Sequence, residues 1–334
     1  MISASISRIL FFTLFACNLF AETICEPAIA NRSSRSWTDS NQLYVFADVL
    51  YWRAEEGATT WADVVHIQPK NFFDQQDLSF GWDFGFRGGI GYNLDWDQWD
   101  TQLAYTWFRT KASDSFTLSS DDVGIILSEY LGAFIELPRT IFGSTSIQWS
   151  ILFNMFDWEL GRAFLVSKAL SLRPFLGLKG GWIHQTIHTQ WSNPLGLKAR
   201  ENLKNNFWGI GPSGGLNTTW RLGGNERRFF SLFGDVSGAY LWGKWNCSDV
   251  YTDNFPSKVV INTPSTALGA LMFRCFAGTG WATNFNKDRS HFAIRLGYEM
   301  QFWFDQLKTV TFDELRLHHD LTLQGGTCDI RFDF

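Results

Sequence analysis

Three short patterns in the chain resemble sites of chemistry. Residues 209–214 match the GxGxxG pattern of a dinucleotide-binding loop, but no helical period follows them and Pro212 interrupts the pattern. His184 and His188 have the spacing of metal ligands on a helix, but they end an alternating segment and enter a loop without a carboxylate. The histidine pair at 318–319 is likewise expected on a surface loop. We therefore expect no catalytic, cofactor-binding or metal-binding residues and no enzymatic activity.

The five cysteines do not suggest a metal site or a disulfide framework, because no two have CxxC or metal-type spacing. Cys17 lies in an apolar N-terminal run and Cys25 in the polar stretch after it. Cys247 is expected in a loop, whereas Cys275 and Cys328 are expected on strands.

A larger set of charged residues shares one property, since each occupies the polar positions of a segment with period two. They are Asp83, Arg87, Asp100, Asp157, Glu159, Arg173, Lys179, Asp235, Arg274, Arg295, Glu299, Asp329, Arg331 and Asp333. Two interpretations stay open. The side chains form a hydrated, salt-bridged filling of a narrow barrel, or some of them line a water-filled path and set its ion preference.

The segment that best shows this alternation is Phe80–Trp107, which reads as one hairpin. Phe80, Trp82, Phe84 and Phe86 occupy one face, and Gly, Asp and Arg occupy the other. An aromatic outer wall with a polar inner wall is typical of a transmembrane β-barrel. A soluble β-sandwich is the alternative, although its apolar face would use more Val, Ile and Leu.

Ten alternating segments follow one another, each long enough to cross a tilted bilayer, for which about 9–11 residues suffice. They are 43–54, 80–94, 98–110, 146–163, 168–185, 206–221, 228–243, 265–281, 289–304 and 325–334. Short and long connections alternate strictly, and the long ones are 55–79, 111–145, 186–205, 244–264 and 305–324.

Short periplasmic turns, long outer loops and an even strand count are typical of outer-membrane barrels. We therefore predict an all-β fold, an antiparallel transmembrane β-barrel of about 10 strands. Twelve strands is the alternative if Ala62–Gln68 or Ser115–Leu118 adds strands.

The composition supports this class of protein. The chain has 334 residues, a formal net charge of −5 and 17 Trp, which aromatic girdles at both membrane interfaces would use. No basic run suggests nucleic acid as a partner. Past the first two dozen residues no apolar run is long enough for a transmembrane helix.

The two ends of the chain carry targeting patterns. Arg8, an apolar run and Ala21 read as a signal peptide at 1–21, with cleavage after Ala30 as the second choice and a lipoprotein signal as a weaker alternative. A flexible periplasmic leader at 22–41 and a barrel domain at 42–334 follow. The terminal strand ends on Phe334, which is typical of the signal read by the bacterial barrel-assembly machinery.

Taken together, these segments resemble the pore-forming, major-outer-membrane-protein-like family of Legionella and of Chlamydia-related bacteria. The resemblance covers 46–57, 80–94, 99–110, 157–185, 205–220, 229–235, 295–304 and the terminal RFDF, and its most specific block is DWELGRAFLVSKALSLRPFLGLKGGWIHQ at 157–185. It implies an outer-membrane barrel credited with pore formation, and it supplies no catalytic or ligand residues.

We therefore expect a protein of the bacterial outer membrane that lets small hydrophilic solutes or ions diffuse passively. The alternative is a plugged barrel with a structural or adhesive role at the cell surface. A remote alternative is an outer-membrane protease that uses Asp48, Asp83 and His184. The expected partners are outer-membrane lipid and the assembly machinery, with self-association left open.

Overall fold

The computed structural model describes most of the predicted barrel domain. The described residues are 43–57, 59–68, 72–94, 97–118, 123–128, 143–193, 196, 198–225, 227–254, 258–262, 265–285, 290–310 and 316–334. All described residues lie within one compact unit, Thr38–Phe334. The predicted signal peptide, the leader and Cys25 lie outside the described residues.

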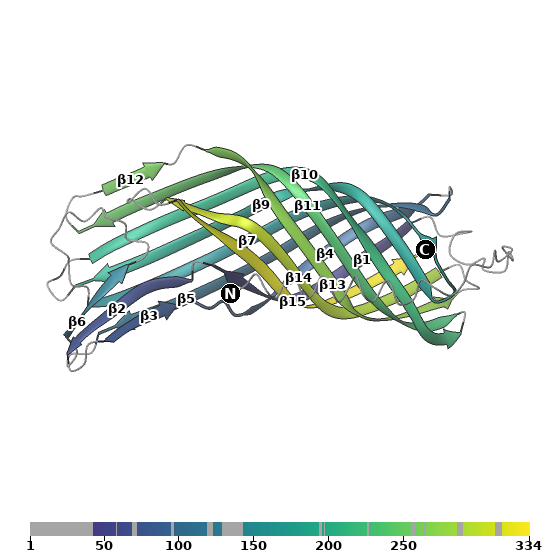
Figure 1. Cartoon of the computed structure of the whole chain (residues 1–334), viewed down its shortest axis with the longest axis horizontal. Coiled ribbons are helices and arrows are strands. Elements are labelled where there is room, and N and C mark those ends of the chain that lie inside the picture. Colours follow the sequence, from purple (N-terminus) through teal and green to yellow (C-terminus); the bar gives the residue numbers. More distant parts are fainter. Residues whose placement is uncertain are drawn as a thin grey trace, which may run out of the picture. The chain divides into compact units, whose positions relative to one another are not determined.

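Ten long antiparallel strands of the described residues pair into a closed ring (Figure 1). They are β1 (Leu43–Glu56), β4 (Trp82–Asn93), β5 (Trp99–Thr117), β7 (Ser144–Arg162), β9 (Leu170–Ser192), β10 (Lys198–Asn225), β11 (Arg228–Asp253), β13 (Thr266–Phe285), β14 (Ser290–Val310) and β15 (Arg316–Asp333). Each pairs with the next in this order, and β15 closes the ring on β1 with Asp329 opposite Asp48. The predicted ten-stranded barrel is confirmed.

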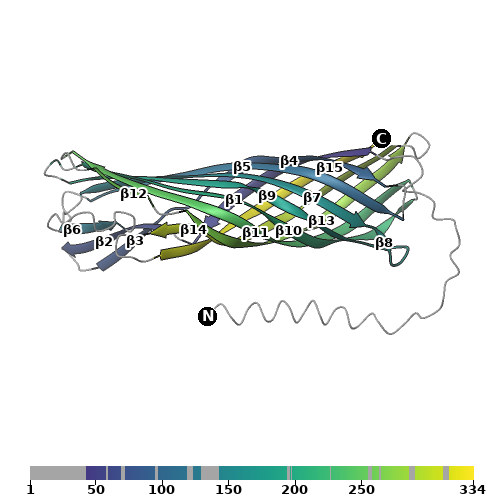
Figure 2. The same cartoon turned by 90° about the horizontal axis from the view of Figure 1, so that it is seen from above.

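Five further strands in the described part of the chain lie outside the ring. β8 (Phe164–Leu165) pairs with β9, and β12 (Lys258–Asn262) pairs with β11. β2 (Thr60–Gln68), β3 (Phe72–Asp77) and β6 (Val123–Ser128) form a separate three-stranded sheet. Both views place β2, β3, β6 and β12 at the end of the barrel opposite the C-terminus (Figures 1 and 2).

The twelve-strand alternative is therefore wrong. Residues 62–68 lie in β2, which pairs only with β3 and β6, and residues 115–117 extend β5. The described residues also include no helix long and apolar enough to cross a membrane.

The period-two alternation places successive side chains on opposite faces of the wall. The side chain of Phe84 is 66% exposed on the outside, whereas Gly85 is buried inside. On β10 the exposed outer residues between Trp208 and Trp220 are mostly apolar. This segment is about as long as a tilted strand that crosses a bilayer, and it defines the apolar band. Register places Trp107, Asn154, Trp182 and Trp208 in one row across β5, β7, β9 and β10. The three tryptophans of this row lie at the outer edge of the apolar band, and we call them the aromatic girdle.

Beyond the girdle the strands continue, contrary to expectation. β9 runs to Ser192 and β10 begins at Lys198, so the predicted long loop 186–205 is wrong. His188 therefore lies on β9 with His184, and Cys247 lies on β11, whereas His188 and Cys247 were expected in loops. The strand β10 extends from Trp208 to Lys198, roughly 34 Å along the chain at about 3.4 Å per residue.

This extension has the opposite polarity to the membrane band. Its outward positions carry polar residues, and exposed examples from five strands are Lys111, Gln148, His188, Lys204 and Lys244. Most of its inward positions carry apolar residues, and fully buried examples are Trp149, Ile183, Ile187, Phe207 and Trp245. The alternation therefore persists, but water replaces lipid as the outer solvent and the interior becomes an apolar core.

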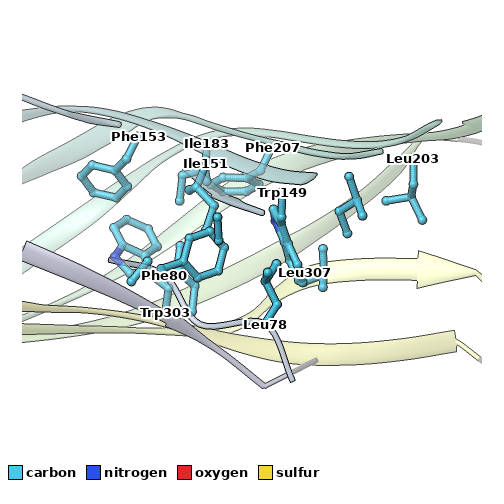
Figure 3. Packing of buried hydrophobic residues seen from close by; sticks show 14 of the residues in the cluster. Leu78, Phe80, Trp149, Ile151, Phe153, Ile183, Leu203, Phe207, Trp303 and Leu307 are labelled. Atoms are coloured by element: carbon cyan, nitrogen blue, oxygen red, sulfur yellow. The ribbon is translucent and has the colours of Figure 1, made fainter. Parts of the chain in front are cut away.

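Part of the segment between β1 and β4 enters this core (Figure 3). We call the whole buried cluster, formed by ring strands and by this segment, the outer plug. Trp61 of β2 and Leu78 and Phe80 before β4 are at most 3% exposed. Phe80 packs edge-on against Trp149 of β7, with ring centroids 5.8 Å apart. The predicted place of Phe80 on the outer aromatic face is wrong, because the alternating strand begins only at Trp82 and the chain before it turns inward.

We predict that arginine on the apolar band destabilises the barrel far more than arginine beyond the girdle. Leu176 of β9 is 74% exposed at the middle of the band, so Leu176→Arg should cost about 2–4 kcal/mol because lipid must accept the charge. Gln148→Arg is the matched control on the neighbouring strand β7, where water contacts the side chain. Urea titrations in lipid vesicles measure both. Equal losses of unfolding free energy in the two variants would show that the residues assigned to the apolar band do not face lipid.

Candidate functional site

At membrane depth the interior holds a connected set of ion pairs, which we call the ion-pair layer. Its centre is Glu299 of β14, whose side chain is fully buried. Arg87 Nη2 of β4 lies 2.7 Å from Glu299 Oε1, and Arg274 Nε of β13 lies 2.6 Å from the same oxygen. Two guanidinium groups thus share one carboxylate, which supplies the charge-assisted hydrogen bonds that buried ions need.

Further bonds hold this centre in place. Arg87 Nη1 lies 2.8 Å from Asp48 Oδ2 of β1, and Arg87 Nε donates to Thr106 Oγ1 at 3.0 Å. The Thr327 hydroxyl donates to Glu299 Oε2 at 3.2 Å and accepts a hydrogen bond from Trp52 Nε1 at 3.0 Å. These bonds link neighbouring strands of the ring. The Arg87–Glu299 pair joins β4 to β14, which are not neighbours, so the layer also ties separate walls of the barrel.

Four more ion-paired groups extend the layer along the barrel. Arg295 pairs with Asp235 and Asp329, Lys179 with Asp157, Arg173 with Asp100 and Glu159, and Arg331 with Asp333. Aromatic rings lie over all three of these guanidinium groups, with Arg173 Cζ 5.5 Å from the centre of the Phe175 ring. Arg331 Cζ lies 3.7 Å from the centre of the Tyr44 ring, and Arg295 Cζ lies 4.9 Å from that of Phe233.

The predicted set of fourteen charged residues lies on the inward face of the wall. Thirteen of them take part in these ion pairs, whereas Asp83 has no ion pair within the described part of the chain. Their role in lining a pore stays a prediction. The set omitted Asp48, which the alternation of β1 could have identified, since Tyr44, Asp48 and Trp52 share one parity.

The inward glycines do not leave the open space expected in a pore. A Cβ atom at Gly91 would overlap the Tyr44 ring, and one at Gly89 would overlap the Phe46 ring. A Cβ at Gly209 would lie 2.6 Å from Phe207 Cζ. The glycines therefore let neighbouring aromatic rings lie flat against the wall, and these rings fill the interior.

The residues considered for a protease are not brought together. Asp48 is paired with Arg87 at membrane depth, whereas His184 lies on the outward parity of β9 with its Nδ1 2.7 Å from Asn206 Oδ1. The described residues also include no group of three or more His, Cys, Asp or Glu arranged to hold a metal ion. The interior that we consider as the functional site therefore consists of the ion-pair layer and the outer plug.

Comparisons with known proteins place this geometry in context. Residues 38–334 match the family model of the Legionella pneumophila major outer membrane protein precursor. A comparison with curated proteins found no match.

Among solved structures, the outer membrane protease OmpT from Escherichia coli is similar, with 11% identity and a TM-score of 0.43 over 88% of this chain and 97% of that one. A Pseudomonas aeruginosa FadL homologue has 10% identity and a TM-score of 0.27, over 88% and 90% of the two chains. The P. putida toluene transporter TodX has 10% identity and a TM-score of 0.29, over 89% and 91%.

We predict that Glu299→Ala destabilises the folded barrel by about 3–5 kcal/mol, because it leaves two buried guanidinium groups without their carboxylate. The control is Asp97→Asn, which removes the ion pair of Asp97 with Arg162 at the short-turn end, where the side chains are 53% and 34% exposed. That loss should be about 0–1 kcal/mol. Urea unfolding in detergent measures both, and a small loss for Glu299→Ala would mean that water already solvates the layer.

Proposed function

Because the chain belongs to the family of the Legionella pneumophila major outer membrane protein precursor, it is an outer-membrane β-barrel, and we propose that this barrel is closed along its axis. The protein then acts at the cell surface through the strands that extend beyond the membrane. The observation that carries this proposal is the filled interior, which is closed by charged side chains at membrane depth and by apolar side chains beyond it.

The ion-pair layer supports closure at membrane depth. Glu299 is 0% exposed, and Arg87, Asp48, Asp235 and Asp329 are all buried. The middle of the layer is therefore out of contact with bulk water. A ring of about eight strands is just filled by its side chains, and ten strands add little width. Tyr44 and other rings packed over glycines use that extra width.

The outer plug supports closure beyond the girdle. Trp149, Trp245 and Trp303 from three walls are at most 2% exposed and belong to one buried cluster with Leu78 and Phe80 (Figure 3). A hydrated ion or sugar that entered this mostly apolar cluster would lose most of its water and gain few hydrogen bonds in return, which is costly. The plug therefore opposes passive diffusion more strongly than the charged layer does.

The surface role that we propose uses the polar outer face of the extended strands and the sheet of β2, β3 and β6. These elements stand beyond the aromatic girdle, where they can contact other cells, matrix or neighbouring copies. A signal peptide at 1–21 would direct export. Recognition of Phe334 by the assembly machinery would direct insertion, and that residue is accessible, with its ring 54% exposed and its N–H donating to Leu43 O at 3.1 Å.

Passive diffusion of small hydrophilic solutes is the second candidate. One observation favours it: nearly every ring strand contributes acidic or basic residues at membrane depth. These residues could guide ions if the layer were hydrated. Conduction would also require the outer plug to open. Residues 59–80, which belong to no barrel strand, could leave the plug without breaking a barrel ladder.

We predict that the folded, monomeric protein gives no steady conductance in planar bilayers. Replacing Trp61, Leu78 and Phe80 by glycine should leave the barrel folded but create a cavity in the plug, and it should raise the frequency of brief current events. Heat-modifiable migration on gels confirms folding. Steady channels from the verified native monomer would reject the closed barrel and establish diffusion instead.

We also predict that the extended strands face the medium. In a background without native cysteines, Gln148→Cys should react with a membrane-impermeant maleimide on intact cells, because the residue is exposed beyond the outer girdle. Lys168→Cys is exposed at the short-turn end and should react only after lysis. The reverse pattern of labelling would show that the barrel has the opposite orientation in the membrane.

A further inference from the structure

Two buried carboxyl groups lie side by side inside the extended part of the barrel. Glu201 of β10 is 3% exposed and Asp249 of β11 is 9% exposed. Neither carboxylate oxygen of Glu201 forms a hydrogen bond of normal geometry, and Asp249 Oδ1 has none either. Buried carboxylates usually have such partners, so this pair is an exception that needs an explanation.

Register defines the surroundings of the pair. Glu201 lies opposite Thr189 of β9 and opposite Tyr251 of β11. Asp249 lies opposite Leu203, two positions from Glu201, so the two carboxyl groups are diagonal neighbours on one face, within reach of each other. Asp253 Oδ1 is also without a hydrogen bond in the structure as described, and Asp253 Oδ2 accepts one from the Tyr251 hydroxyl at 3.4 Å.

Asp253 lies close to this pair, and Lys308 of β14 places its Nζ 3.8 Å from the centre of the Trp245 ring, further along β11. The described ion pairs include none to Glu201 or Asp249, and the basic residues of the same strands, such as Arg200, Lys204 and Lys244, lie on the outward parity. Burial and the neighbouring Asp249 raise the pKa of Glu201 well above its usual range. Burial also raises the pKa of Asp249. Burial and the closeness of the two acids therefore favour one proton shared by the pair when no ligand is bound.

Aromatic rings border the pair. Trp191 of β9 lies opposite Ala199, which is two positions from Glu201, and Trp191 contacts the Trp61 ring at 6.4 Å between centroids. Tyr251 is 2% exposed directly opposite Glu201. Carboxylates together with aromatic faces are the environment that binds organic cations.

We propose that Glu201 and Asp249 bind the ammonium group of a small organic amine at the outer end of the barrel. The ammonium donates to both carboxylates and to the Thr189 hydroxyl oxygen, and its alkyl chain packs on Trp191 and Tyr251. A metal ion fits less well, since the described residues hold no cluster of three ligating side chains. Binding of R–NH₃⁺ displaces the shared proton, so one H⁺ is released and the site holds two carboxylates and one ammonium.

The amine site adds a ligand to the proposed surface role. It rests on that role in one respect, since this part of the barrel must lie outside the membrane. It does not depend on whether the barrel conducts. A failure to bind amines therefore leaves the conductance result untouched, and steady conductance would not remove the site.

Isothermal titration of the full-length protein in detergent micelles tests it, with propylammonium chloride as the probe and 1-propanol as the neutral control. At pH 8 the native protein should bind propylammonium and not propanol. Titrations in buffers of different ionisation enthalpy should show about one proton released, and affinity should rise at least three-fold from pH 6 to pH 8 because fewer protons compete.

The variant Glu201→Gln with Asp249→Asn should weaken propylammonium binding at least ten-fold and abolish proton release. Glu55→Gln is the matched control, because Glu55 is exposed on the outward face of β1. If the double variant does not fold, Glu201→Gln alone replaces it. Absence of propylammonium binding, equal affinity in the pair variant and the native protein, or competition by Mg²⁺ at equal concentration would each overturn the proposal.

Discussion

The rest of the structure depends on the closure of ten strands into one hydrogen-bonded ring. Once β15 pairs with β1 no strand of the ring has a free edge, and every second side chain of every strand must fit into a single narrow interior. The interior is therefore filled or empty according to the size of the inward side chains. Here those side chains include Tyr44, Trp52, Phe108 and Trp149, and the glycines beside them make room for rings rather than for water.

The solvent outside the wall decides what the interior contains. At membrane depth lipid accepts the aromatic outer face, so the interior can hold charges as long as each finds a partner, as Arg87 and Glu299 do. Beyond the girdle the outer face meets water, and only an apolar interior can drive the strands to remain together. Trp208 on the outside marks the change, because from Phe207 towards the outer end β10 faces a mainly apolar core, in which Glu201 and Asn205 are polar exceptions.

The same change of polarity explains how far the fold could be predicted from sequence. All ten ring strands, their order and the parity of Phe84 and Gly85 follow from period-two patterns that lipid on one side makes easy to recognise. The outer halves of β9 and β10 carry the same period with apolar residues inside, but their polar outer positions resemble a loop. The inward turn of Phe80 could not be predicted, since nothing local distinguishes Phe80 from Trp82. Pairs such as Asp157–Lys179 follow from the register of adjacent strands, whereas Arg87–Glu299 depends on which strands face each other across the ring, and alternation alone specifies neither.

The two layers differ in what opening them would require. Separating Glu299 from Arg87 and Arg274 leaves charges unpaired in a confined space, but water entering from the periplasmic side could solvate them gradually. The outer plug offers water much less, because Trp149, Leu78 and most of their neighbours are apolar and polar groups such as Gln185 are few among them. The plug can open only if a whole group of side chains leaves together. In the described structure the segments 59–68, 72–80 and 123–128 combine buried plug residues with independence from the ring, so any opening of this barrel begins with them.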